Sequence, residues 1–130
     1  MGQQQLLLIL VGVIITGIAV AVGITIFQTN AAGQNRDAVW SDLNHLGAKA
    51  QQYFRKPHAL GGGDRSFTGF KISRKEAEND NGMYYVTADP LEVKIKGYGR
   101  EIGNDNTNLV TLNLVVHPDT MYVDESLGFN

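Results

Sequence analysis

The sequence predicts an α+β fold in which one long N-terminal α-helix packs against a four- or five-stranded antiparallel sheet. Two observations predict it. An unbroken apolar run at residues 6–27 leads, with no proline before Pro57, into a segment with helical periodicity. From about residue 67 the pattern changes to short alternating segments separated by turn-forming residues, which is typical of antiparallel strands.

The chain divides by composition into an apolar N-terminal part, residues 1–30, and a head, residues 31–130. All 11 Lys and Arg and all 13 Asp and Glu residues lie from Arg36 onward. Between residues 6 and 27 the only polar side chains are Thr16 and Thr25, whose hydroxyls can donate to carbonyls of their own helix. At ~1.5 Å per residue this run extends ~33 Å, enough to cross a membrane. We predict a helix despite the many β-branched residues, because a lone segment in lipid must satisfy its own backbone.

Two other interpretations of the apolar part must be weighed. A secretory signal peptide has a basic start and a shorter apolar core, whereas this start is uncharged and the core is long. A single-pass anchor explains the length, but anchors are normally oriented by Lys or Arg near one end, and neither end has one. We therefore hypothesise that a basic leader has been removed and that Met1 is the mature N-terminus.

Small residues recur along the apolar run. They are Gly12, Gly17, Ala19, Ala21 and Gly23. Ala19 and Gly23 are four residues apart, a spacing that lets two helix backbones approach closely. Glycine is also common in membrane helices, so both helix-on-helix packing and ordinary membrane composition remain open.

Residues 31–56 continue the helix with an apolar stripe on one side. Asp37, Asp42, Lys49 and Gln52 lie on the opposite, polar side. We predict one helix from about residue 2 to about residue 55, with Gly33 as the position of a bend or fray. Pro57 and the glycines at 61–63 close it, the latter as a flexible hinge. The residues expected to pack on the head are Val39, Trp40, Leu43, Leu46, Ala50 and Phe54.

Five segments of the head are predicted strands: residues 67–73, 83–88, 91–98 and 109–117, with a short edge strand at 121–123. In the third, Val93 and Ile95 alternate with Lys94 and Lys96, the pattern of a half-buried antiparallel strand. The apolar face of this sheet must pack on the stripe of residues 39–54, the one apolar stripe available. The sequence therefore predicts a meander laid across the second half of the helix.

No catalytic constellation is evident in the sequence, and we expect no enzyme activity, cofactor or metal site. His45, His58 and His117 have no partners at ligand spacing. The Asp- and Asn-rich stretches at 78–82 and 103–107 are typical of turns. A net charge of -2 without a basic cluster gives no sign of nucleic-acid binding, and the absence of cysteine excludes disulfides.

A charge-free N-terminal helix that becomes amphipathic and is covered by a small antiparallel sheet resembles the type IV pilin family. The resemblance covers the apolar part in detail and the head by layout. It implies a leader peptidase, methylation of the new N-terminus, the inner membrane as the site before assembly, and a pilus assembly machinery. It further implies a structural subunit, taken as the major pilin of a helical homopolymer serving adhesion, motility or surface contact.

The sequence departs from the pilin pattern at three places. Most pilins have glutamate where this chain has Gln5, and many have proline where it has Val22. The disulfide-closed C-terminal loop of many bacterial pilins is also absent. A glutamine keeps an acceptor oxygen but loses the charge, so recruitment of a subunit by charge is not implied here.

In such a filament the terminal amine of Met1 and the side chains of Gln3, Gln4 and Gln5 would lie among helices without water. Burying an unpaired amide costs roughly 1–3 kcal/mol, so these groups must bond to neighbouring chains. We predict that they form the filament core together with Gly12, Gly17, Ala19 and Gly23. The alternatives are a monomeric single-pass membrane-anchored binding module, and a minor or secretion-system pseudopilin.

Overall fold

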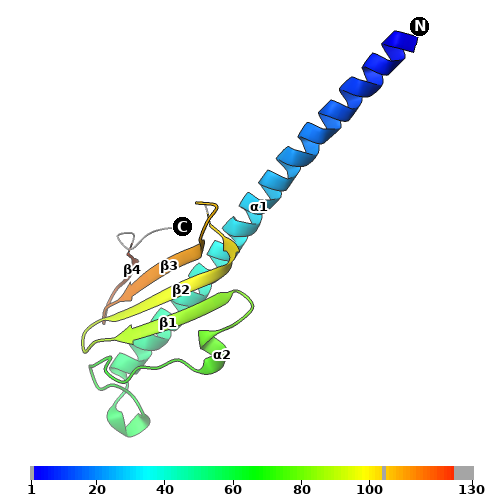
Figure 1. Ribbon diagram of the computed structural model, residues 1–130. Coiled ribbons are helices and arrows are strands. Elements are labelled where there is room, and N and C mark those ends of the chain that lie inside the picture. Colours follow the sequence, from blue (N-terminus) through cyan, green and yellow to red (C-terminus); the bar gives the residue numbers. More distant parts are fainter. Residues whose placement is uncertain (1, 104, 125–130) are drawn as a thin grey trace. The chain divides into compact units, whose positions relative to one another are not determined.

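The computed structural model describes residues 2–103 and 105–124. The chain forms two compact units, Met1–Ala31 and Ala32–Asn130, called the stem unit and the head unit below. The elements are α1 (Gly2–Arg55), the 3₁₀ helix η1 (His58–Leu60), α2 (Arg74–Ala77) and the strands β1 (Gly82–Ala88), β2 (Val93–Ile102), β3 (Leu109–Val116) and β4 (Met121–Val123) (Figure 1). The predicted α+β fold, with a long N-terminal helix and an antiparallel sheet, is confirmed.

Helix α1 has the predicted bounds and remains helical through Gly33. It ends because the chain after Pro57 turns back onto its last carbonyls. The backbone N–H groups of Gly63 and Arg65 donate to the carbonyls of Tyr53 and Phe54, at 2.8 and 2.7 Å. These are carbonyls that every helix end leaves without an intrahelical donor.

The glycines at 61–63 therefore form a packed helix cap, where the sequence predicts a flexible hinge. Gly62 and Gly63 are buried. A Cβ built on Gly62 would lie 2.1 Å from the Lys56 carbonyl oxygen, and one on Gly63 would lie 1.8 Å from that of Ser66. Both positions require glycine because backbone passes too close for any side chain.

The sheet is an antiparallel meander in the order β1-β2-β3-β4. Ile95 on β2 lies opposite both Val86 on β1 and Leu114 on β3. The strands predicted at 83–88, 109–117 and 121–123 are confirmed to within a residue at each end. Strand β2 begins two residues later than predicted and continues to Ile102, with an irregular register against β3 between Tyr98 and Ile102.

The strand predicted at residues 67–73 is wrong. Phe67 and Phe70 are both buried, but the Phe70 N–H donates to the Phe67 carbonyl at 2.9 Å, and Gly69 between them has φ +86°. Two apolar residues three apart on a turn reach the same core that two residues of a strand would reach. Ser73 then begins α2 through a capping box with Glu76.

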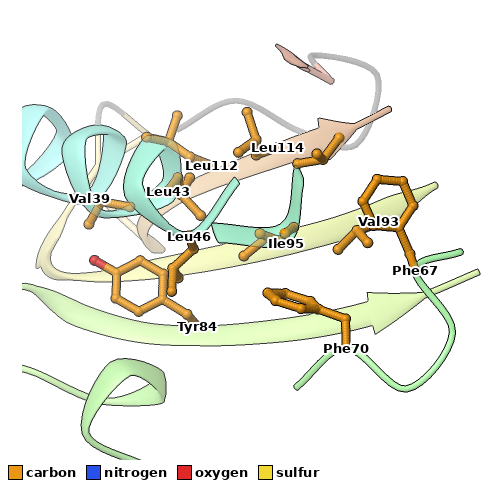
Figure 2. Packing of buried hydrophobic residues seen from close by; sticks show 12 residues of the cluster. Val39, Leu43, Leu46, Phe67, Phe70, Tyr84, Val93, Ile95, Leu112 and Leu114 are labelled. Carbon is orange, nitrogen blue, oxygen red and sulfur yellow. The ribbon is translucent and has the colours of Figure 1, made fainter. Parts of the chain in front are cut away.

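The core of the head unit lies between the second half of α1 and the inner face of the sheet. Figure 2 shows Val39, Leu43 and Leu46 pointing from α1 toward the strands. The sheet and the loop before it supply the other side: Phe67, Phe70, Tyr84, Val93, Ile95, Leu112, Leu114 and Val116. Core residues recur at every second position on the strands and at every third or fourth position on the helix, and the two sets pack together.

Strand β2 carries glycine where side chains of α1 come close to the sheet. The inward-facing residues of β2 are, in order, Val93, Ile95, Gly97 and Gly99, so the inner face of the strand changes from branched side chains to glycine. A Cβ on Gly97 would lie 2.9 Å from a Val39 methyl, and one on Gly99 would lie 2.0 Å from the Asn35 amide oxygen. This end of the sheet therefore lies against side chains of α1, among them the amide of Asn35, which forms hydrogen bonds to β2.

Candidate functional site: the apolar stem and the polar clamp of the head

The stem unit is an apolar helix whose side chains are not buried by any other described residue. Its large apolar side chains between residues 6 and 27 are all exposed, from 44% at Val11 to 73% at Phe27. Among the described residues, α1 is the one helix long and apolar enough to cross a membrane, a property that signal sequences share. So large an apolar surface is not stable in water and requires lipid or other protein around it.

The hydroxyl groups inside the stem unit are turned onto their own helix. Thr16 donates to the Gly12 carbonyl at 2.8 Å, and Thr25 donates to the Ala21 carbonyl at 3.1 Å. Thr29 likewise donates to the Thr25 carbonyl at 3.0 Å. The middle of the stem therefore offers no side-chain hydrogen-bond donor to a neighbour.

Amide side chains lie at both ends of this apolar segment. Gln3, Gln4 and Gln5 precede it and Gln28 and Asn30 follow it, and all five are exposed. In the described part of the chain none of the five forms a side-chain hydrogen bond. Met1, which the sequence groups with the glutamines, lies outside the described residues.

The small residues of the stem unit pack against no other part of the chain that the structure describes. A Cβ built on Gly12, Gly17 or Gly23 would meet nothing within 4 Å, and Ala19 is exposed. Their backbones are accessible, so a second helix could approach them closely.

Within the head unit, Val39, Leu43, Leu46 and Ala50 are buried in the core, at 0–2% exposure. Phe54 is partly buried against the core, and its ring centroid lies 4.8 Å from that of Phe67. Trp40 differs from this set, because it is 39% exposed and outside the core cluster. One residue along a helix is a rotation of ~100°, which turns Trp40 away from the face that Val39 presents to the sheet.

A polar clamp joins α1 to the start of β1, and sequence reasoning missed it. The Asp42 carboxylate accepts hydrogen bonds from the Tyr84 hydroxyl at 2.6 Å and from the side-chain amides of Asn79 and Asn81 at 2.9 Å each. Burial disfavours the charge on Asp42, but these three donors outweigh it and leave the pKa of Asp42 lowered. Burial, with the Asp42 charge beside it, raises the pKa of the Tyr84 hydroxyl.

Asn35 extends the clamp to the irregular end of β2. Its amide oxygen accepts from the backbone N–H groups of Arg100 at 2.8 Å and Glu101 at 3.2 Å. Its amide nitrogen donates to the Asn81 carbonyl at 2.9 Å. Both N–H groups lie where the β2–β3 register shifts, so a side chain of α1 supplies an acceptor where the ladder is interrupted.

A second contact holds α2 to the helix. The Lys49 ammonium on α1 donates to the Glu76 carboxylate, which also accepts from the backbone N–H and hydroxyl of Ser73 at 2.9 and 2.8 Å. The hydrogen bond from Lys49, followed by those from Ser73, lowers the pKa of Glu76 from 4.5 to about 2.

These lowered pKa values predict that acid destabilises the head unit. The folded state binds a proton on Glu76 or Asp42 more weakly than the unfolded state does, so their stabilisation is complete above pH 4.5 and is lost as pH falls toward 2. We expect the free energy of unfolding of the chain in detergent micelles, followed by fluorescence of Trp40, to fall over this range. Glu76→Gln should flatten the fall, while Glu101→Gln serves as the matched control; equal slopes in the two variants would contradict the assignment.

Comparisons with models of protein families, with curated proteins and with solved structures find no match to this chain. Within residues 2–103 and 105–124, no group of three or more His, Cys, Asp or Glu residues is placed to hold a metal ion. The two features that bear on function are the exposed stem unit and the head unit, in which the sheet is clamped to the second half of α1.

Proposed function

We propose that this chain is the structural subunit of an extracellular, pilin-like filament, in which stem units of many copies form the core and head units form the surface. The observation that carries the proposal is the stem unit itself: an apolar helix exposed along its whole length, with its hydroxyls bonded internally. An assembly machinery in the inner membrane, and the membrane itself before assembly, are the partners this function requires.

The head unit supports the proposal because its core is complete without the stem unit. Val39 is the first residue of α1 in the core cluster of the head unit, and no described residue of the stem unit belongs to it. Residues 6–27 are thus left for contacts outside the subunit. A row of such subunits can bury its stems together while each head remains folded and in contact with water.

The hydrophobic effect contributes little when a stem moves from the membrane into a filament, but it strongly opposes the loss of a stem from the filament into water. Lipid tails are about as apolar as a bundle of stems, so moving a stem from the membrane into a filament gains little from the hydrophobic effect, and packing must supply the preference. Removing a stem from a filament into water would expose each large apolar side chain at a cost of about 1.5–3 kcal/mol. We expect such filaments to withstand dilution and salt, and to be dissociated by detergents that solvate the stem.

The direct test is to shear material from the cell surface and to examine it by negative-stain microscopy and mass spectrometry. The proposal predicts filaments with this chain as the main component, and their loss on adding detergent. A chain that stays in the membrane fraction as a monomer would instead be a membrane-anchored binding module. A chain found in a few copies per filament would be a minor subunit.

Gln5→Leu is expected to reduce filament assembly while leaving membrane insertion intact. The substitution lengthens the apolar run, so insertion does not suffer, but it leaves the partner of the Gln5 amide unpaired in the core, at about 1–3 kcal/mol per contact. The measurement is the ratio of the chain in the sheared fraction to that in the membrane fraction. Thr16→Val is the matched control because its hydroxyl bonds to its own helix. Filaments in normal amount from Gln5→Leu would rule out this role.

A further inference from the structure

The amide side chains of the stem unit are confined to its two ends. Between residues 6 and 27 the two hydroxyls donate to carbonyls one turn earlier in the same helix. Gln3, Gln4 and Gln5 at one end and Gln28 and Asn30 at the other carry exposed amides. Each amide both donates and accepts, so two such groups from different copies can satisfy each other.

Filament symmetry restricts which amides can meet. Subunits of a helical filament point the same way and are related by a rotation with a rise, so a segment of one copy contacts a different segment of the next. The glutamines at residues 3–5 span only ~4.5 Å of helix. Copies offset by more than this span plus the reach of two glutamine side chains cannot bring their glutamines together.

The position of the partner follows from what lies along the neighbouring stem. Opposite residues 6–27 the glutamine carbonyls would find no side-chain donor, since the threonine hydroxyls are already used. The next amides along the helix are those of Gln28 and Asn30, which lie ~200° apart around it, so one or the other can face a given neighbour. The three consecutive glutamines likewise cover ~200° of their end.

We propose that, in the filament, the amides of Gln3–5 in one copy bind the amides of Gln28 and Asn30 in a second copy displaced along the axis by one apolar segment. The displacement is ~36 Å, the rise of the 24 residues from 4 to 28. This inference rests on the proposed filament function and adds to it a specific partner and register for the stem. The apolar segment sets the spacing, and the amides at its ends fix it.

Engineered cysteines test the register, and no native cysteine competes with them for disulfide formation because the chain has none. Gln5→Cys is combined with Gln28→Cys in one variant and with Asn30→Cys in another, and filaments are treated with a mild oxidant. A disulfide requires the two Cα atoms to lie within about 7 Å. Because each subunit would bond to one copy through residue 5 and to another through residue 28 or 30, a non-reducing gel should show a ladder of multimers from at least one variant.

The controls separate the register from general proximity. Gln5→Cys combined with Ile15→Cys places the second thiol in the middle of the stem and should give no ladder. Gln5→Cys alone should give monomers. A ladder with position 15 but not with 28 or 30, dimers from Gln5→Cys alone, or intact filaments without any crosslink would each overturn the proposed register. Absence of filaments from the unmodified protein would instead refute the filament function.

Leucine substitutions give a second test that does not require oxidation. Leucine at residues 3–5, or leucine at residues 28 and 30, should lower the detergent concentration that half-dissociates the filaments severalfold, or abolish filaments, because each leaves the other set of amides unpaired. Combining the two sets should restore resistance at least in part, since replacing both partners removes the unpaired groups. Additive losses, or no recovery of filaments in the combined variant, would overturn the pairing. Thr16→Val should leave the dissociation point unchanged.

Discussion

Leu43→Ala is expected to destabilise the head unit by about 2–5 kcal/mol, a large share of the stability of a small domain. Leu43 is 0% exposed and lies in the cluster where α1 meets the sheet. Removing its side-chain carbons leaves a cavity that the helix cannot close, because Val39 and Leu46, one turn to either side, are held in the same core (Figure 2). The loss combines the transfer of the missing carbons with the cavity left behind.

The measurement is urea unfolding of the chain in detergent micelles, followed by circular dichroism of the sheet. Trp40→Ala on the same helix is the matched control, because Trp40 is 39% exposed and outside the core, and it should cost much less. Equal destabilisation by the two variants would mean that the stripe of α1 is not what holds the sheet. Leu43→Met, which keeps the volume, should recover most of the loss.

Gly63→Ala is expected to cost about 2–4 kcal/mol, from overpacking and from hydrogen bonds lost at the end of α1. The added methyl would lie 1.8 Å from the Ser66 carbonyl oxygen and 2.7 Å from the Tyr53 ring, so the loop must move away. Moving it releases the N–H of Gly63 from the Tyr53 carbonyl, and it weakens the neighbouring bond from Arg65 to Phe54.

This substitution decides between a packed cap and a flexible hinge at residues 61–63. A hinge tolerates alanine with little change in stability, whereas a cap does not. Gly33→Ala is the control within α1: a Cβ there meets nothing within 4 Å, and alanine favours helix over glycine by about 1 kcal/mol, so it should be neutral or stabilising. Thermal unfolding of both variants in the same micelles gives the comparison, and a silent Gly63→Ala would restore the hinge.

The features of the fold that repeat along the chain could be predicted from the sequence. The bounds of α1 follow from the absence of proline before Pro57 and from the apolar stripe, and the meander follows from alternation such as that of Val93 and Ile95. Residues 67–73 could not be assigned the same way. Phe67 and Phe70 are buried apolar residues in a turn. Buried apolar residues occur both in strands and in turns that pack on the core, so their presence alone does not distinguish the two.

The polar clamp was beyond sequence reasoning for a physical reason. Asp42 lies next to the buried stripe of α1, and a carboxylate there points either to water or to donors that only the folded sheet supplies. Those donors are Tyr84 and the two asparagines of a turn 37 to 42 residues further along the chain. The available signal was the pair Asn79 and Asn81 just before β1, two amides in a turn that needs at most one. The contacts proposed for the stem unit are with other molecules, and a single sequence gives only the chemical character of such contacts.

The Asp42 clamp fastens the sheet to α1 without any covalent cross-link. The head is fastened by an ionised carboxylate and three neutral donors, in a chain without cysteine. Such a fastening consists of hydrogen bonds alone, and no thiol oxidation is needed to complete it. The strength of the clamp is therefore independent of the redox potential around the protein.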